Sequence, residues 1–194
     1  MFRQLEEPIS LLTSLQLFRS PSRLESLMKD LETHDAVSSP IMDSLIKETT
    51  RFYVSINDLR LVRRPESIKQ RPDIPVLPKG SVVSISPYLT HHDPGTWLLA
   101  DTWYPERWQQ EPDLDKKVNS GGELCYMPFG AGTHRCPGEK MAIRVTSVAV
   151  ATILQNAKID WGKGGREQNT TRLDFSKVGS PWLKGDVRLK FRRN

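Results

Sequence analysis

The stretch that decides the fold of this chain runs from residue 128 to residue 139 and reads PFGAGTHRCPGE. Three glycines and two prolines surround Cys136, and a strongly helical pattern follows directly. A cysteine just before a helix gains from the positive end of the helix dipole, and glycine-rich backbone exposes amide N–H groups to its sulfur. Both effects favour the thiolate. The stretch therefore indicates a metal-bound thiolate, with glycines that let the backbone lie close to a flat, bulky cofactor and with Phe129 beside it.

Other chemistries are weaker explanations of this stretch. A dinucleotide fingerprint would need a third glycine at position 135, which is Arg. A catalytic cysteine assisted by a histidine would need a recognisable nucleophile motif, and none is present. A free cysteine is commonly a buried, inert thiol, but the glycine-rich loop and the helix that follows argue against that interpretation here. A zinc site would lack the usual ligand spacing. Its candidate ligands would be His91, His92, Cys125, His134 and Cys136.

A second informative segment lies upstream, at residues 39–53. Ser39 is a predicted N-cap, Pro40 suits the first helical position, and apolar residues continue at helical spacing. Glu48 falls in the middle of that apolar stripe, so its carboxylate must be paired. Arg51, three residues on, can reach it with two parallel hydrogen bonds. On this spacing alone an ordinary exposed helix pair remains open.

The third segment is the aromatic run WYPERW at residues 103–108, which by itself predicts a packed turn. Elsewhere, hydrophobic periodicity predicts a helix from residue 21 to about 34 and another over 138–157. The second is expected to bury a stripe containing Met141, Val145 and Val148. Alternation predicts short strands within 56–69 and 81–88 and a terminal hairpin at 173–178 and 187–191, and residues 109–123 are expected to form a surface loop.

Composition narrows the class of protein. The 194 residues suit one domain, and a net charge of +5 with scattered basic residues gives no nucleic-acid-binding patch. Two cysteines cannot build a disulfide scaffold, and no apolar run is long enough to cross a membrane. Glu6, Glu7 and Pro8 stand where a signal peptide would need a basic start and an apolar run. The sequence favours an intracellular protein with no membrane anchor in this chain.

Taken together, the three segments resemble motifs of the cytochrome P450 superfamily. Residues 129–138 match its haem-binding pattern F-x-x-G-x-[R/H]-x-C-x-G at every fixed position. Glu48 to Arg51 matches the E-x-x-R helix, and residues 105–108 match the P-E-R-F run with Trp in place of Phe. The expected fold is mainly α with small β-sheets (α+β), the C-terminal, haem-proximal part of the P450 fold. It would occupy residues 21–194, after an irregular remnant at 1–20.

The resemblance implies roles for individual residues. Cys136 would be the axial thiolate ligand of haem iron. Glu48, Arg51 and Arg107 would form a buried salt-bridged triad. The expected haem-binding residues are Phe129, Gly132, His134, Cys136, Gly138 and Arg60, with His134 and Arg60 meeting the propionates. No catalytic residue beyond the haem ligand can be named.

The resemblance also implies an activity. Family members are monooxygenases that insert one oxygen atom of O2 into an apolar substrate, with NADPH-cytochrome P450 reductase as the expected electron donor. Within the superfamily, the chain looks most like the branch that holds sterol 14α-demethylases, cholesterol 7α-hydroxylase and prostacyclin synthase, on the basis of residues 127–132, 136–138 and 179–188. The composition and sequence style resemble those of a fungal enzyme of secondary metabolism. Full-length members are usually bound to the endoplasmic reticulum membrane.

The length departs from the family pattern. Full-length members are well over twice as long and carry substrate-recognition helices and a central helix with an acid–alcohol pair. Pro8 interrupts the only residues that could form that helix here. The alternative interpretation is a truncated, catalytically silent fragment or an incomplete gene model, with exposed apolar surface and poor solubility.

Overall fold

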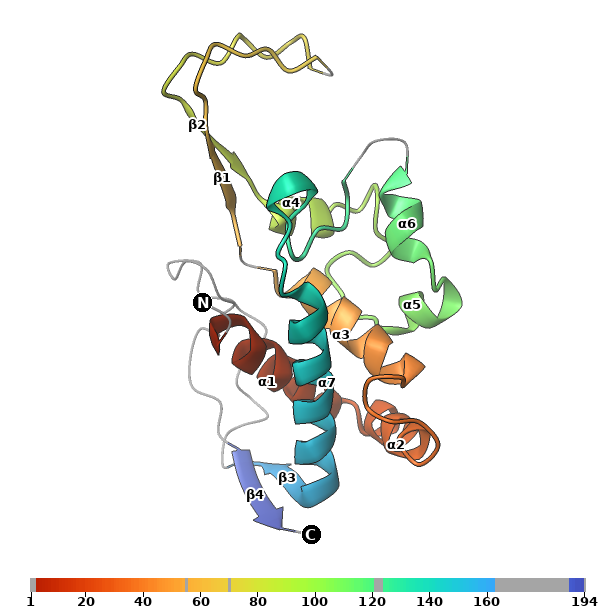
Figure 1. Cartoon of the computed structure of the whole chain (residues 1–194). Helices are drawn as coiled ribbons and strands as arrows, with labels where there is room; N and C mark the ends of the chain where they lie inside the picture. The colour runs from red at the N-terminus through yellow and green to blue at the C-terminus, as the bar shows by residue number, and fades with distance from the viewer. Residues whose placement is uncertain (1–2, 55, 70, 121–123, 163–188, 194) are drawn as a thin grey trace.

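Three helices form the centre of the molecule. The computed structural model describes residues 3–54, 56–69, 71–120, 124–162 and 189–193. Helices α1 (Arg3–Arg19), α3 (Pro40–Phe52) and α7 (Glu139–Asn156) pack on one another, and α2 (Pro21–Asp30) lies against α1 and α3 (Figure 1). The short helices α4 (Pro87–His91), α5 (Glu106–Gln110) and α6 (Leu114–Val118) follow in the chain before α7. The expected class, mainly α with small β-sheets, is confirmed.

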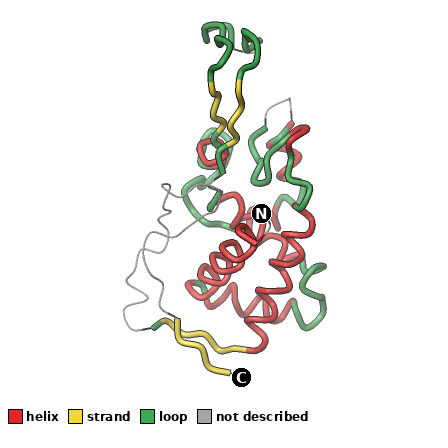
Figure 2. The backbone as a smooth tube through the Cα atoms, turned by 60° about the vertical axis from the view of Figure 1, so that its left-hand side comes forward, coloured by secondary structure: helices red, strands yellow, loops and turns green. Residues whose placement is uncertain are grey.

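Two small antiparallel sheets complete the described structure. Strands β1 (Asp58–Leu61) and β2 (Val82–Ile85) pair in one, and they form an arm that projects away from the helices (Figure 2). Strands β3 (Ala157–Trp161) and β4 (Leu189–Arg193) pair in the other. The expected strands at 56–69 and 81–88 are thus shorter than the pattern suggested. Of the expected terminal hairpin, residues 173–178 lie outside the described residues.

Helix α3 begins as the sequence predicts. The Ser39 hydroxyl accepts a hydrogen bond from the Met42 amide at 2.9 Å, and Pro40 occupies the first turn. This satisfies one of the amide donors that the first turn leaves without a helical partner. The helix buries a run of mixed polarity, including Glu48 and Arg51, and therefore places charged side chains inside the molecule.

Two local expectations are wrong. Residues 1–20 were expected to be irregular, but α1 occupies Arg3–Arg19 despite Pro8. Its residues Leu12, Leu15 and Leu17 are buried, and the helix packs mainly against α7, so tertiary contacts favour helix there. Residues 109–123 were expected to be a loop, yet they contain the end of α5 and all of α6. Their polar composition reflects exposed short helices.

Helix α7 buries the opposite side from the one expected. Met141, Val145 and Val148 are 61%, 39% and 50% exposed. The buried residues are mostly small: Ala142, Thr146, Ser147, Val150, Ala151 and Leu154. Small side chains allow the close approach of α1, and close packing rather than the hydropathy of single residues selects the buried face.

Candidate functional site

A buried carboxylate organises the middle of the molecule. Glu48 on α3 is 0% exposed. Its Oε1 accepts hydrogen bonds from Arg51 Nη2 at 2.9 Å and from the Tyr104 amide at 2.9 Å. Its Oε2 accepts from Arg51 Nε at 3.1 Å, Arg107 Nε at 3.1 Å and Trp108 Nε1 at 3.0 Å. The two carboxylate oxygens are therefore satisfied, which is the condition for keeping a charge away from water.

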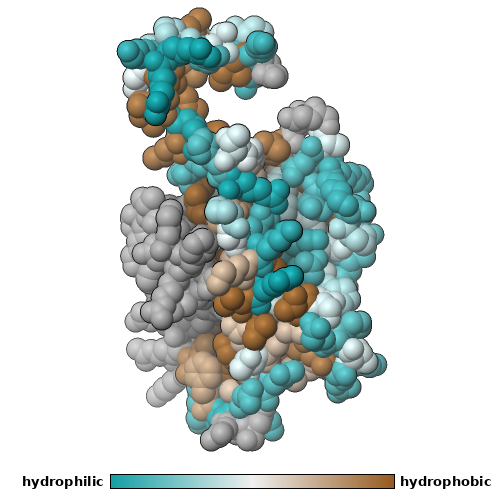
Figure 3. Space-filling model, in the orientation of Figure 1, coloured by the Kyte–Doolittle hydropathy of each residue, from teal (hydrophilic) through white to brown (hydrophobic). Residues whose placement is uncertain are grey.

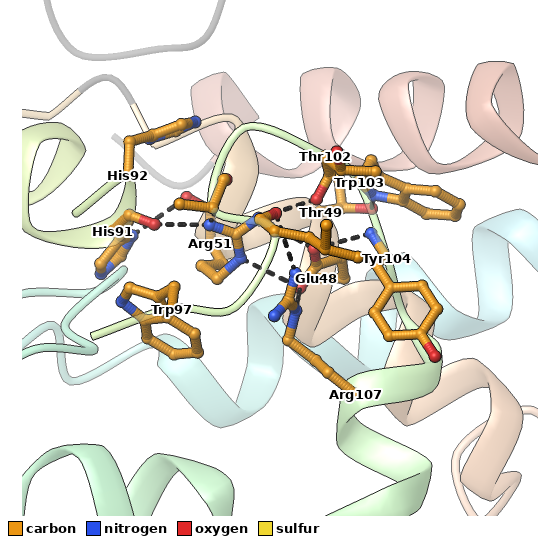
Figure 4. Close-up of polar contacts among 12 residues, drawn as sticks. Glu48, Thr49, Arg51, His91, His92, Trp97, Thr102, Trp103, Tyr104 and Arg107 are labelled. Carbon is orange, nitrogen blue, oxygen red and sulfur yellow. Dashed lines mark hydrogen bonds and ion pairs between the residues drawn. The ribbon is translucent and has the colours of Figure 1, made fainter. Parts of the chain in front are cut away.

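Arg51 pairs with Glu48 and also binds the backbone around it. Besides the bidentate ion pair, its guanidinium donates to the carbonyl oxygens of His91, Ala100 at 3.0 Å and Thr102 at 3.2 Å. The side chain is fully buried, with the Trp97 ring centroid 5.4 Å from its Cζ. Figure 4 shows Arg51 between Glu48 and His91, with Trp97 beside it. Arg51 thus ties α3 to the segment that follows α4.

Arg107 on α5 brings the second positive charge. It donates to Glu48 and to the carbonyl oxygens of Leu98 and Leu99. Burial lowers the pKa of this guanidinium below its ordinary value, and the charge of Glu48 offsets only part of that shift. Leu99 adopts a left-handed φ of 54°, a conformation that costs energy for a residue with a Cβ. The two arginines hold its carbonyl and that of Ala100, which keeps the loop in this shape. The structure therefore brings Glu48, Arg51 and Arg107 together.

The glycine-rich stretch forms a tight loop that ends at α7. The Cys136 amide donates to the Phe129 carbonyl at 2.9 Å, and the Gly130 amide donates to the Met127 carbonyl at 3.1 Å. Gly130 and Gly132 have φ values of +77° and +63°, which favour glycine. Phe129 is buried at 7% exposure. The Cys136 side chain is partly exposed and makes no disulfide, and it lies three residues before the first residue of α7.

These features suit a thiolate-ligated haem. A Cβ built on Gly132 would meet no atom within 4 Å, so the space beside the loop is open. The partly exposed Cys136 side chain stands just before the first turn of the 18-residue helix α7, near the positive end of the helix dipole. The donor set, one cysteine in a loop of small residues, fits a cofactor that brings its other iron ligands with it.

The other expected haem-binding residues are placed as follows. Gly138 is the N-cap of α7, and Gly132 and His134 bound a short 3-10 turn, with His134 exposed. Arg60 on β1 pairs with Asp58, whose carboxylate lies 3.7 Å from a Cβ built on Gly130. Arg60 therefore reaches the loop through Asp58, and no described contact joins it to His134.

Sequence reasoning missed several groups that complete the site. The indole of Trp108 and the amide of Tyr104 bind Glu48, and His91 bonds to backbone at both ring nitrogens. The P-E-R-W run was a partial signal for Trp108. For His91 the sequence offers only the weak interpretation of a zinc ligand. In the part of the chain that the structure describes, no three histidine, cysteine or acidic side chains gather into a metal-binding group.

Two further findings concern the surroundings of the site. A cavity of about 400 Å3 lies between α5, α6 and the loop before Leu98, with Trp97, Arg107 and Cys125 among its lining residues. None of residues 128–138 lines it, so it is separate from the Cys136 loop. Among the helices within the described ranges, none is both long and apolar enough to span a membrane.

Comparison with known proteins agrees with this geometry. A family model for cytochrome P450 matches residues 25–185. The chain is 53% identical over 179 residues to cytochrome P450 monooxygenase pytD of Aspergillus terreus, covering 90% of this chain and 47% of that protein. It is 41% identical over 189 residues to cytochrome P450 monooxygenase pynD of Aspergillus niger, covering 94% and 39%.

A sterol 14-alpha demethylase, CYP51A of Gibberella zeae, is 34% identical over 166 residues, covering 78% of this chain and 32% of that protein. The chain therefore spans less than half the length of these three relatives. All three come from fungi, and the sterol demethylase agrees with the branch that the motifs favoured. On the family match and the identity to these relatives, the chain belongs to the cytochrome P450 family.

Proposed function

We propose that this chain is the haem-ligating part of a cytochrome P450 monooxygenase and that Cys136 supplies the axial thiolate. One observation carries the proposal. The Cys136 thiol is partly exposed just before α7, in a loop that has left-handed glycines at positions 130 and 132 and open space at Gly132. The proposed domain assignment is that residues 21–194 form the C-terminal part of the P450 domain, a range that contains the family match at 25–185.

Several residues would hold the cofactor. Cys136 would ligate the iron, the buried Phe129 would support the loop, and Gly132 and Gly138 would let the backbone lie close to the cofactor. His134 and Arg60 are proposed partners of the propionates, with Arg60 exchanging its bond to Asp58. A thiolate-ligated haem supplies the O2 chemistry of this family, and its thiolate pushes electron density that favours O–O cleavage.

The relatives support a class of substrate, and family membership supports the proposed electron donor. Relatives named as monooxygenases and sterol demethylases support an apolar small-molecule substrate, and no feature supports nucleic acid. The proposed electron donor is NADPH-cytochrome P450 reductase at the endoplasmic reticulum surface. Lys140 and Arg144 are exposed on the first turns of α7, beside the Cys136 loop. Their positive charge would steer an acidic partner to this face.

The test is a difference spectrum of the 194-residue chain expressed with haem available. We expect the reduced carbon monoxide complex to show the red-shifted Soret band of thiolate ligation, and Cys136→Ala to abolish it. Cys125→Ala is the matched control, because Cys125 is buried outside the loop and should leave the band intact. A band that survives Cys136→Ala would refute the ligand assignment.

The second candidate function is a catalytically silent fragment, because the chain spans less than half the length of its relatives. It predicts that the folded chain takes up no haem and shows no such band. In a chain that does show the band, adding an apolar substrate and the reductase tests turnover separately from ligation. Product formation supports the monooxygenase, and its absence shows haem ligation without turnover.

A further inference from the structure

His91 uses both ring nitrogens on backbone groups that are far apart in sequence. It is the last residue of α4 and is 0% exposed. Its Nδ1 lies 3.0 Å from the Arg51 carbonyl oxygen, and its Nε2 lies 2.9 Å from the Met127 amide nitrogen. A carbonyl can only accept and an amide N–H can only donate, so the ring carries its proton on Nδ1 and accepts through Nε2. Both polar atoms of the buried ring are satisfied.

Aromatic neighbours hold the plane of this ring. Tyr126 stacks against it at 5.5 Å between centroids with 28° between planes, and Trp97 meets it edge-on at 6.4 Å and 72°. Burial lowers the pKa of His91 to about 3, so the imidazole is neutral. A neutral ring with a fixed tautomer and a fixed plane is suited to define the position of a backbone amide.

The amide that His91 holds is the first in a short series that leads to Cys136. The Met127 carbonyl accepts from the Gly130 amide, and the Phe129 carbonyl accepts from the Cys136 amide at 2.9 Å. Met127 is thus bonded to His91 on its N–H side and to the turn on its carbonyl side. A shift of Met127 would move the turn and, with it, the thiol.

On its other side, His91 is bonded twice to Arg51. Its Nδ1–H donates to the Arg51 carbonyl, and its own carbonyl accepts from Arg51 Nη1. Arg51 in turn is fixed by the bidentate pair with Glu48, both fully buried. Figure 4 shows Arg51 between Glu48 and the backbone of His91.

We infer that His91 is a positioning residue that sets the place of the Cys136 loop relative to the buried Glu48–Arg51 pair, by accepting the Met127 N–H. The inference deepens the proposed function, because the loop it positions is the one assigned to haem ligation. The bond itself belongs to this chain with or without haem, so it can be tested in both states.

Two substitutions separate the two bonds of the ring. In His91→Gln the longer side chain can place an oxygen near the position of Nε2 and keep the acceptor for Met127. In His91→Asn the shorter amide can keep a donor near Nδ1 for Arg51 but cannot reach Met127. His92→Asn is the control, since His92 is only half-buried and its Nδ1 lies 3.0 Å from the Tyr88 carbonyl on its own helix.

The first measurement is amide hydrogen exchange of the haem-free 194-residue chain. We expect the Met127 and Cys136 amides to exchange about five- to tenfold faster in His91→Asn, which is the effect of losing one hydrogen bond. His91→Gln and His92→Asn should keep the protection of the original chain. The Tyr53 amide, bonded to Thr49 at the end of α3, is the internal reference for global unfolding.

The second measurement is the reduced carbon monoxide spectrum of haem-loaded protein. We expect His91→Asn to lose part of the red-shifted band and His91→Gln to keep it. Equal protection of Met127 in His91→Asn and the original chain would overturn the inference. So would loss of Met127 protection in His91→Gln while Tyr53 stays protected, which also decides the matter where His91→Asn does not fold. Absence of the band in the original chain would instead refute the proposed function and leave the exchange test standing.

Discussion

At the residue scale, the fully buried Glu48 carboxylate binds both Arg51 and Arg107. Its carboxylate balances part of the charge of Arg51 and Arg107, and the remaining donors of these guanidinium groups go to backbone carbonyls. Carbonyl dipoles near a buried cation lower its cost without removing its charge. The cluster therefore tolerates burial only as a complete set.

We expect Glu48→Gln to lower the free energy of unfolding by about 3–5 kcal/mol, because it leaves two buried cations facing a neutral amide that is partly a donor. Urea denaturation of the haem-free chain measures this. The matched control is Asp113→Asn, which breaks the Asp113–Lys116 pair, whose two side chains are each 77% exposed. That variant should unfold like the original chain. Equal losses in the two variants would contradict a special role for the buried pair.

His91 also predicts a dependence of stability on pH. Its pKa is about 3 in the folded chain, while the unfolded chain has the ordinary value of about 6.5. Below pH 6.5 the unfolded state binds a proton that the folded state does not, so stability falls as the pH decreases toward 3. The charged or titratable groups that also disfavour protonation are Arg51 and His92.

The measurable quantity is the difference in unfolding free energy between the original chain and His91→Gln. We expect this difference to fall by about 1.6 kcal/mol between pH 6.5 and pH 5, since the slope approaches roughly 1.4 kcal/mol per pH unit only below the unfolded-state pKa. Carboxylates and His92 titrate in both proteins and cancel in the difference. A difference that does not change with pH over this window would show that His91 is not held neutral.

At the scale of elements, the loop before α7 depends on left-handed glycines. Gly132→Ala and Gly80→Ala form a matched pair, because both positions have positive φ and neither new Cβ would meet an atom within 4 Å. Each should cost about 1 kcal/mol of stability from backbone strain alone. Only Gly132→Ala should also weaken the red-shifted Soret band, since Gly80 lies in the arm beyond β1. Similar spectra for the two variants would contradict a role for the geometry of this loop in haem binding.

How much of each element could be predicted depended on whether its determinants were local. Ser39 and Pro40 predicted the start of α3 correctly, because capping involves groups within one turn of the helix. The pairing of Glu48 with Arg51 was visible for the same reason. In α7 the periodicity was visible but the buried side was not, because the close approach of α1 selects small residues over Met141 and Val145.

At the scale of the whole molecule, apolar side chains remain on the surface. Leu59, Leu61 and Val82 on the arm are 60%, 63% and 65% exposed, and Met141 and Val148 on α7 are 61% and 50% exposed. Figure 3 shows hydrophobic side chains along the arm and, below it, over the helical part of the molecule. Exposed apolar surface of this kind favours association.

We expect the chain alone to self-associate as its concentration rises, which sedimentation velocity measures. A variant that combines Met141→Gln with Val148→Thr should shift the distribution toward monomer. Val37→Thr is the control, because Val37 is 47% exposed on the loop before α3 and a single exposed apolar residue is ordinary. A monomeric original chain, or an equal effect of the control, would contradict the prediction.

By itself, the sequence determined the family, the class of fold and the carboxylate that needs a cation, because motifs, caps and periodicity act over a few residues. It also indicated Cys136 as the proposed haem ligand. Only the tertiary structure decided what surrounds them. Trp108, 60 residues further along the chain, donates a hydrogen bond to the Glu48 carboxylate. His91 binds the Arg51 carbonyl, 40 residues before it, and the Met127 amide, 36 residues after it. Backbone amides and carbonyls are the same at every position, so no pattern in a sequence marks which of them a buried ring will bind.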